Sequence, residues 1–117
     1  MRLDRRVILA LDVTDTERAR SLARSVRGEV DAIKVNWPLV LAGGLGIVRE
    51  LSAAAYVLCD FKIADIPNTN RLIIEQAARA FEAPFFYASA KTGDNVEFVF
   101  RRLGTMTLQR EGLPAVT

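Results

Sequence analysis

The sequence has 117 residues, half of them hydrophobic, which is enough for one small domain with a core. Its 16 basic and 14 acidic residues are spread along the chain without a basic block, which argues against nucleic-acid binding. The sequence contains no histidine and one cysteine, Cys59, so it excludes Ser-His-Asp catalysis, a disulfide framework within the chain and most zinc sites.

Strand-length apolar runs alternate with helical patterns along the chain. Helices are predicted where apolar residues recur every three to four positions, and Thr14 with Glu17 matches a capping box at the start of the first helix. Gly43, Gly44 and Gly46 weaken the second helix. The predicted strands are 6–13, 30–35, 56–61 and 84–90, and the predicted helices are 14–28, 38–55, 68–81 and 93–103.

Four strand–helix units predict an α/β fold with a parallel sheet. The sheet is expected to be either half of a (βα)8 barrel or a flattened, doubly wound three-layer arrangement. We expect one domain over residues 1–117, with residues 105–117 as an extended or frayed tail. The apolar run Val7–Leu11 is too short for a signal peptide or a membrane helix, and the single cysteine within an apolar run suits the cytoplasm.

Charged residues gather where the predicted strands end. In parallel sheets the carboxyl ends of the strands meet at one edge, and ligands bind there. We therefore expect a cluster there, which either fixes loop conformation through ion pairs or transfers a proton between groups of perturbed pKa. The residues are Asp12, Lys34, Asp60, Lys62 and Asp65.

Three segments, "VILALDV", "IKVNWPLVLAGG" and "CDFKIADIPNTN", closely resemble orotidine 5′-phosphate decarboxylases of the archaeal type over about residues 1–75. The resemblance implies that Lys62 protonates C6 of the pyrimidine and that Asp60 destabilises the substrate carboxylate. It also implies that Asp65 completes the charge network from a partner subunit, while Asp12 and Lys34 contact the ribose. Ile66 and Thr69 match positions that also reach across a dimer. The family uses no metal and no organic cofactor.

Residues 76–104, with "APFFYASAKTGDNVEFVFRRL", resemble instead the last strand and helix of Ras-like small GTPases. The resemblance implies that Ser89, Ala90 and Lys91 match the loop that contacts guanine. A phosphate loop and an N-K-x-D segment are absent from the sequence, so specific GTP binding is not expected. A join of two ancestries inside the third predicted helix is typical of a constructed chimera.

Three functional hypotheses follow from these two resemblances. The chain is a recombinant chimera with little or no activity, a truncated decarboxylase with residual activity as a dimer, or a nucleotide- or phosphate-binding module without chemistry. Binding energy from the non-reacting phosphate drives catalysis in enzymes of this kind. The resemblance places the phosphate-binding loops later in a full barrel, which favours the first hypothesis. Open sheet edges and the intact loop from Asp65 to Thr69 predict a homodimer.

Overall fold

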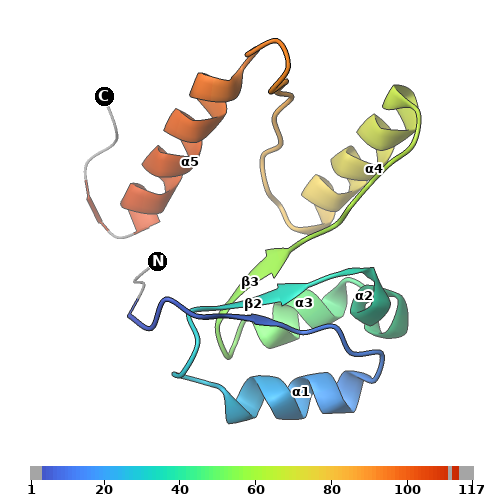
Figure 1. Ribbon diagram of the computed structural model, residues 1–117, viewed down its shortest axis with the longest axis vertical. Coiled ribbons are helices and arrows are strands. Elements are labelled where there is room, and N and C mark those ends of the chain that lie inside the picture. Colours follow the sequence, from blue (N-terminus) through green and yellow to red (C-terminus); the bar gives the residue numbers. More distant parts are fainter. Residues whose placement is uncertain (1–3, 111, 114–117) are drawn as a thin grey trace. The chain divides into compact units, whose positions relative to one another are not determined.

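The computed structural model describes residues 4–110 and 112–113. They divide into two compact units, one within Arg2–Ala64 and one within Asp65–Thr117 (Figure 1). The first unit carries a parallel sheet and helices, which confirms the predicted α/β class and the parallel sheet. Among the described residues no helix is both long enough and apolar enough to cross a bilayer.

The first unit is built on a three-stranded parallel sheet in the order β1-β2-β3. Its strands are β1 (Ile8–Ala10), β2 (Ala32–Val35) and β3 (Tyr56–Cys59). Ile33 at the centre pairs with Leu9 on one side and Val57 on the other. All three strands are shorter than predicted, but each lies within its predicted range.

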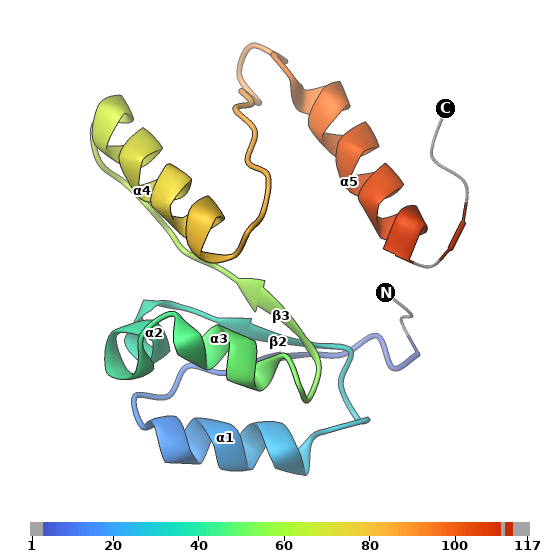
Figure 2. The same cartoon turned by 180° about the vertical axis from the view of Figure 1, so that it is seen from behind.

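Three helices pack on one side of this sheet (Figures 1 and 2): α1 (Thr16–Ser25), α2 (Trp37–Gly43) and α3 (Gly46–Leu51). The core between sheet and helices consists of apolar side chains with at most 8% exposure. Arg20 of α1 also donates from Nε to Glu50 of α3 over 2.6 Å, which ties these two helices at the surface. The largest fully buried side chains are Leu11, Ile33, Val35, Leu39, Ile47 and Leu51.

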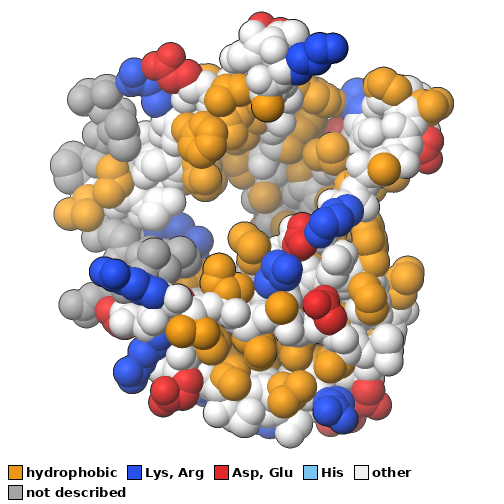
Figure 3. Space-filling view, in the orientation of Figure 1, with side chains coloured by type: hydrophobic (Ala, Val, Ile, Leu, Met, Phe, Trp, Pro, Cys, Tyr) orange, Lys and Arg blue, Asp and Glu red, His pale blue; other side chains and the backbone are white. Residues whose placement is uncertain are grey.

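The other side of the sheet carries exposed apolar side chains. Ile8 is 59% exposed, Leu58 52% and Tyr56 38%, although all three lie on strands. Side chains alternate along a strand, so these residues point away from the face that packs on the helices. Figure 3 shows hydrophobic side chains at the surface of the molecule among charged ones. The sheet of this unit is thus packed on one face only.

Two local predictions for the first unit were wrong. The first helix is capped by Asp15, whose Oδ1 accepts from the Arg18 N–H at 2.6 Å, and not by Thr14. The helix predicted over residues 38–55 is divided into α2 and α3. Gly44 has a φ of +69°, a conformation in which an α-helix cannot continue and which glycine adopts without steric cost.

The second unit contains α4 (Pro67–Ala80) and α5 (Val96–Arg110), joined by irregular chain. Neither helix has a buried residue. The strand predicted at 84–90 does not form, because that segment pairs with no other strand. Its last residues enter a turn in which Ser89 N–H donates to the Asp94 carbonyl at 3.0 Å. The extended or frayed tail predicted over residues 105–117 was wrong for 105–110, which belong to α5, and residues 111 and 114–117 lie outside the described residues.

Candidate functional site

Lys34, Asp60 and Lys62 form a charge cluster at the carboxyl ends of β2 and β3. Lys62 Nζ donates to Asp60 Oδ2 at 2.5 Å, and Lys34 Nζ lies 3.7 Å from the same oxygen. The side chains of Lys34 and Asp60 are about one third exposed, whereas that of Lys62 is 72% exposed. One carboxylate is therefore held between two ammonium groups.

The sheet register places Asp60 beside Lys34. Lys34 pairs with Leu58, and the hydrogen-bond ladder continues one step beyond β3, where Asp60 N–H donates to the Val35 carbonyl at 2.9 Å. Because side chains alternate, Leu58 and Asp60 share the face on which Lys34 lies. Val35 and Cys59 then lie on the opposite face, toward the helices. Backbone pairing thus determines that the Asp60 side chain, and not that of Cys59, lies beside Lys34.

The two lysines keep the Asp60 carboxylate ionised. The hydrogen bond from Lys62 is the largest effect on the pKa of Asp60, and together with the charges of Lys62 and Lys34 it outweighs partial desolvation and lowers that pKa. A carboxylate that stays ionised repels a second anion placed beside it, while the adjacent ammonium can deliver a proton. The arrangement suits a reaction in which an anionic group leaves and a proton is added.

Aromatic contacts hold the segment that carries Lys62. The Trp37 ring stacks on Phe61, with ring centroids 4.7 Å apart and an angle of 21° between the planes. The Trp37 indole Nε1–H donates to the Lys62 carbonyl at 3.0 Å. Trp37 was not among the site residues predicted from the sequence. Its position two residues after the second strand was the one available signal.

Asp12 lies two residues beyond β1, at the same end of the sheet. Leu11 N–H donates to the Lys34 carbonyl at 2.9 Å, so the ladder between β1 and β2 also continues past β1. Asp12 is exposed, and within residues 4–110 no hydrogen bond or ion pair is assigned to its side chain. The structure therefore places Asp12 at the predicted edge without joining it to the three-residue cluster.

Asp65, Ile66 and Thr69 belong to the second unit and open α4. Asp65 and Asn70 bind each other twice: Asp65 N–H donates to Asn70 Oδ1, and Asn70 Nδ2 donates to the Asp65 carbonyl, both at 2.9 Å. Ile66 is 64% exposed and Thr69 is half-buried. Asn70 was also missed from the sequence, although it stands within the quoted motif. This clasp fixes the loop that carries Asp65.

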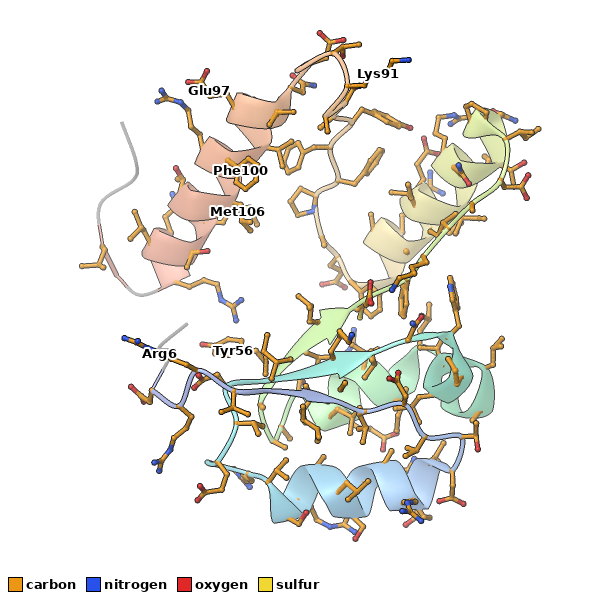
Figure 4. The ribbon with its side chains drawn as sticks, viewed as in Figure 1. Arg6, Tyr56, Lys91, Glu97, Phe100 and Met106 are labelled. Atoms are coloured by element: carbon orange, nitrogen blue, oxygen red, sulfur yellow. The ribbon has the colours of Figure 1, made fainter. Side chains whose placement is uncertain are left out.

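The turn that resembles a guanine-binding loop is held by its own polar side chains. Thr92 N–H donates to Ser89 Oγ at 3.2 Å, and Thr92 Oγ1 donates to Asp94 Oδ2 at 2.8 Å. Ala90 and Lys91 are exposed in this turn, and Figure 4 labels Lys91 just before α5. These bonds account for the turn as a local structural element.

Other chemistries find little support in the described residues. Residues 4–110 and 112–113 hold no group of three potential metal ligands. Cys59 is half-buried and free, and desolvation raises the pKa of its thiol. A raised pKa disfavours the thiolate, which is the nucleophilic form.

The comparisons with known proteins identify the family of this chain. The sequence model of the "Orotidine 5'-phosphate decarboxylase / HUMPS family" matches residues 5–96. A relative from Methanosarcina mazei with the name orotidine 5′-phosphate decarboxylase is 62% identical over 74 residues, which are 63% of this chain and 34% of the relative. The chain thus spans about a third of the length of that relative.

Solved structures give the same result. The crystal structure of orotidine 5′-phosphate decarboxylase from Pyrococcus horikoshii is 48% identical, with a TM-score of 0.56 over 62% of this chain and 36% of that one. The Methanocaldococcus jannaschii enzyme complexed with inhibitor BMP is 26% identical, with a TM-score of 0.57 over 94% of this chain and 65% of that one. These neighbours agree with the reading of the sheet as part of a barrel.

Proposed function

This chain belongs to the orotidine 5′-phosphate decarboxylase / HUMPS family, and from that premise we propose that it acts on orotidine 5′-phosphate as a decarboxylase. The observation that carries the proposal is the Asp60 carboxylate held between Lys34 and Lys62 at the carboxyl end of the sheet. Proton delivery beside a fixed anion is what removal of carbon dioxide from a pyrimidine requires. We therefore prefer the second hypothesis, a truncated decarboxylase with residual activity as a dimer.

In the proposed reaction the bond between C6 and the carboxylate carbon breaks, and its electron pair stays on C6. Asp60 stands against the substrate carboxylate and raises the energy of the bound ground state. Lys62 gives its proton to C6, so that orotidine 5′-phosphate and one proton become UMP and carbon dioxide. Asp12 and Lys34 hold the ribose. The step needs no metal and no organic cofactor.

We propose a homodimer as the active form. Asp65, Ile66 and Thr69 would then face the site of the other subunit, and the clasp between Asp65 and Asn70 would hold that loop ready for it. The edge strands β1 and β3 favour association as well, because an unpaired strand edge can pair with another chain. A cytoplasmic location, expected from the single free cysteine, remains part of this proposal.

The 117-residue chain by itself should turn over slowly. The resemblance places the phosphate-binding loops in a later part of the barrel, and if their grip supplies even ~7 kcal/mol, its absence costs about 10⁵-fold in rate. The assay is therefore formation of UMP from orotidine 5′-phosphate over hours, followed by chromatography. Turnover within about a hundredfold of a full-length relative's, a loss of ~3 kcal/mol or less, would contradict this estimate.

The matched variants are Lys62→Ala and Lys91→Ala, the same substitution at two lysines. Lys91 lies in the turn before α5 and has no part in the proposed reaction. We expect UMP formation to vanish with Lys62→Ala and to persist with Lys91→Ala. If no preparation forms UMP above the uncatalysed rate, or if both variants retain it equally, the proposed function is wrong.

A chimeric origin is a second proposal. It is supported by the extent of the match to the Methanosarcina relative, which is 62% identical but over only 74 residues, 63% of the chain. The family match through residue 96 counts against a join near residue 75, since it extends across that position. In this reading the chain is a recombinant protein with little or no activity, and UMP formation that Lys62→Ala abolishes would favour the truncated decarboxylase instead.

A further inference from the structure

Lys62 lies in the segment between β3 and α4, outside any strand or helix. β3 ends at Cys59 and α4 begins at Pro67, and between them the backbone is irregular. The Lys62 side chain is 72% exposed. Its ion pair with Asp60 is a surface contact, and such pairs hold a flexible side chain only weakly. Something else must fix the backbone from which this side chain extends.

Trp37 makes the contacts that can fix it. Its ring stacks on Phe61, the residue between Asp60 and Lys62, and its indole N–H donates to the Lys62 carbonyl at 3.0 Å. One side chain therefore holds two consecutive residues of the irregular segment. Because the contacts are made to the ring of one residue and the carbonyl of the next, they restrict both the position and the rotation of the Lys62 backbone.

Trp37 is itself anchored to the core. Its backbone N–H donates to Asn36 Oδ1 at 2.8 Å, which caps α2. Two and three residues further along α2, Leu39 and Val40 are buried in the core of the first unit. The ring thus extends from a short, well-packed helix toward the segment beyond β3. Through Trp37, the packed helix α2 thus restrains the backbone of Lys62, which lies outside the core.

We propose that Trp37 is a positioning residue for Lys62, which holds the Phe61–Lys62 backbone so that the ammonium stays against Asp60. The proposal rests on the proposed function for its purpose, since a proton donor that drifts by about 1 Å can lose about a hundredfold in rate. Trp37 is assigned no contact with substrate. Its effect on the position of Lys62 exists whether or not the chain turns over orotidine 5′-phosphate.

Competitive acetylation tests the proposal without turnover. The sequence contains three lysines, Lys34, Lys62 and Lys91, so mass spectrometry of proteolytic peptides can follow each amine separately. Acetic anhydride acetylates the neutral amine, and a lysine nitrogen held against a carboxylate is accessible to the reagent less often than a free one. The ratio of Lys62 to Lys91 labelling in one sample therefore measures how firmly Lys62 is held. High salt should raise this ratio in the unaltered protein, because salt screens an exposed pair.

Two variants separate the contacts of Trp37. Trp37→Phe keeps an aromatic ring on Phe61 and removes the N–H donor, and we expect the Lys62/Lys91 ratio to rise about fivefold, the value of one net hydrogen bond. Trp37→Leu also removes the stacking and should raise the ratio further. Leu41→Ala is the control, since Leu41 lies on the same helix and is 81% exposed. It should leave the ratio unchanged.

An unchanged ratio in Trp37→Phe would overturn the proposal, and this variant decides if Trp37→Leu does not fold. A parallel rise in Lys34 and Lys62 labelling would also overturn it, because Trp37 would then support the unit as a whole. Where UMP formation is measurable, the Trp37 variants should lower kcat and leave KM nearly unchanged. Failure of the unaltered chain to form UMP would refute the proposed function alone, and the labelling result would stand.

Discussion

Replacement of Ile33 by alanine tests whether the sheet of the first unit is packed on one face. Ile33 is fully buried at the centre of β2, between Leu9 and Val57 of the neighbouring strands. Loss of its outer carbons removes buried apolar surface and leaves a cavity, which together cost about 2–5 kcal/mol. Leu58 lies on the other face and is 52% exposed, so Leu58→Ala should cost only about 1 kcal/mol, half of a full burial.

Urea unfolding measures both variants. The fluorescence of Trp37, the one tryptophan in the sequence, reports the first unit directly. With a slope of about 1–2 kcal/mol per molar urea, Ile33→Ala should lower the midpoint by about 1–5 M. If that variant is unfolded without urea, Ile33→Val should cost about 1 kcal/mol. A cost for Leu58→Ala equal to that for Ile33→Ala would refute the reasoning, because the second face would then be covered in solution.

Three further predictions concern the turn after α2, acid stability and nucleotide binding. Gly44→Ala should destabilise the first unit by about 1–2 kcal/mol in thermal unfolding, because φ is +69° there. Gly46→Ala, in the first turn of α3, should be neutral or stabilising. Equal effects of the two substitutions would contradict the backbone conformation assigned to Gly44. Partial desolvation raises the pKa of Asp31, but backbone hydrogen bonds from residues 4–7 outweigh it and lower that pKa. A lowered pKa stabilises the fold above the unfolded value of about 4, and this contribution is lost as pH falls through the folded value. Melting temperatures between about pH 5 and 3 should therefore fall less steeply in Asp31→Asn, and an unchanged slope would refute this. Calorimetry with GDP should show no binding, and micromolar affinity lost on Lys91→Ala would reverse the assignment of residues 89–91 as a structural turn.

The three strands of the first unit were predictable because their apolar runs are short and each is followed by a change to helical spacing. The segment 84–90 also has strand propensity, from its aromatic residues, but such propensity takes effect only where another strand supplies hydrogen bonds. No such strand pairs with it, and the chain turns on itself at Ser89 instead. Composition cannot distinguish these two cases, since pairing is a property of the whole fold.

Only part of the candidate site could be predicted from the sequence. Lys34 and Asp60 were predictable as neighbours because strand period and parallel order are regular, and Lys62 followed from its spacing to Asp60. Trp37 was not predictable, because its role depends on a contact with a segment more than twenty residues away. A tryptophan at the start of a helix is by itself only a large apolar residue. Its direction toward Lys62 is decided by the packing of α2.

The hydrogen bond from Asp60 N–H to the Val35 carbonyl shows that the charge cluster depends on the register of β3 against β2. If β3 slipped by one residue along β2, Asp60 would turn toward the helices and the Cys59 thiol would stand beside Lys34. Folding errors of this kind would thus leave a protein with normal composition and no charge cluster. Insertions between α3 and β3 are tolerable only if the chain absorbs them before Tyr56. Natural variation in length should accordingly concentrate in residues 52–55, where the structure has turns and no strand.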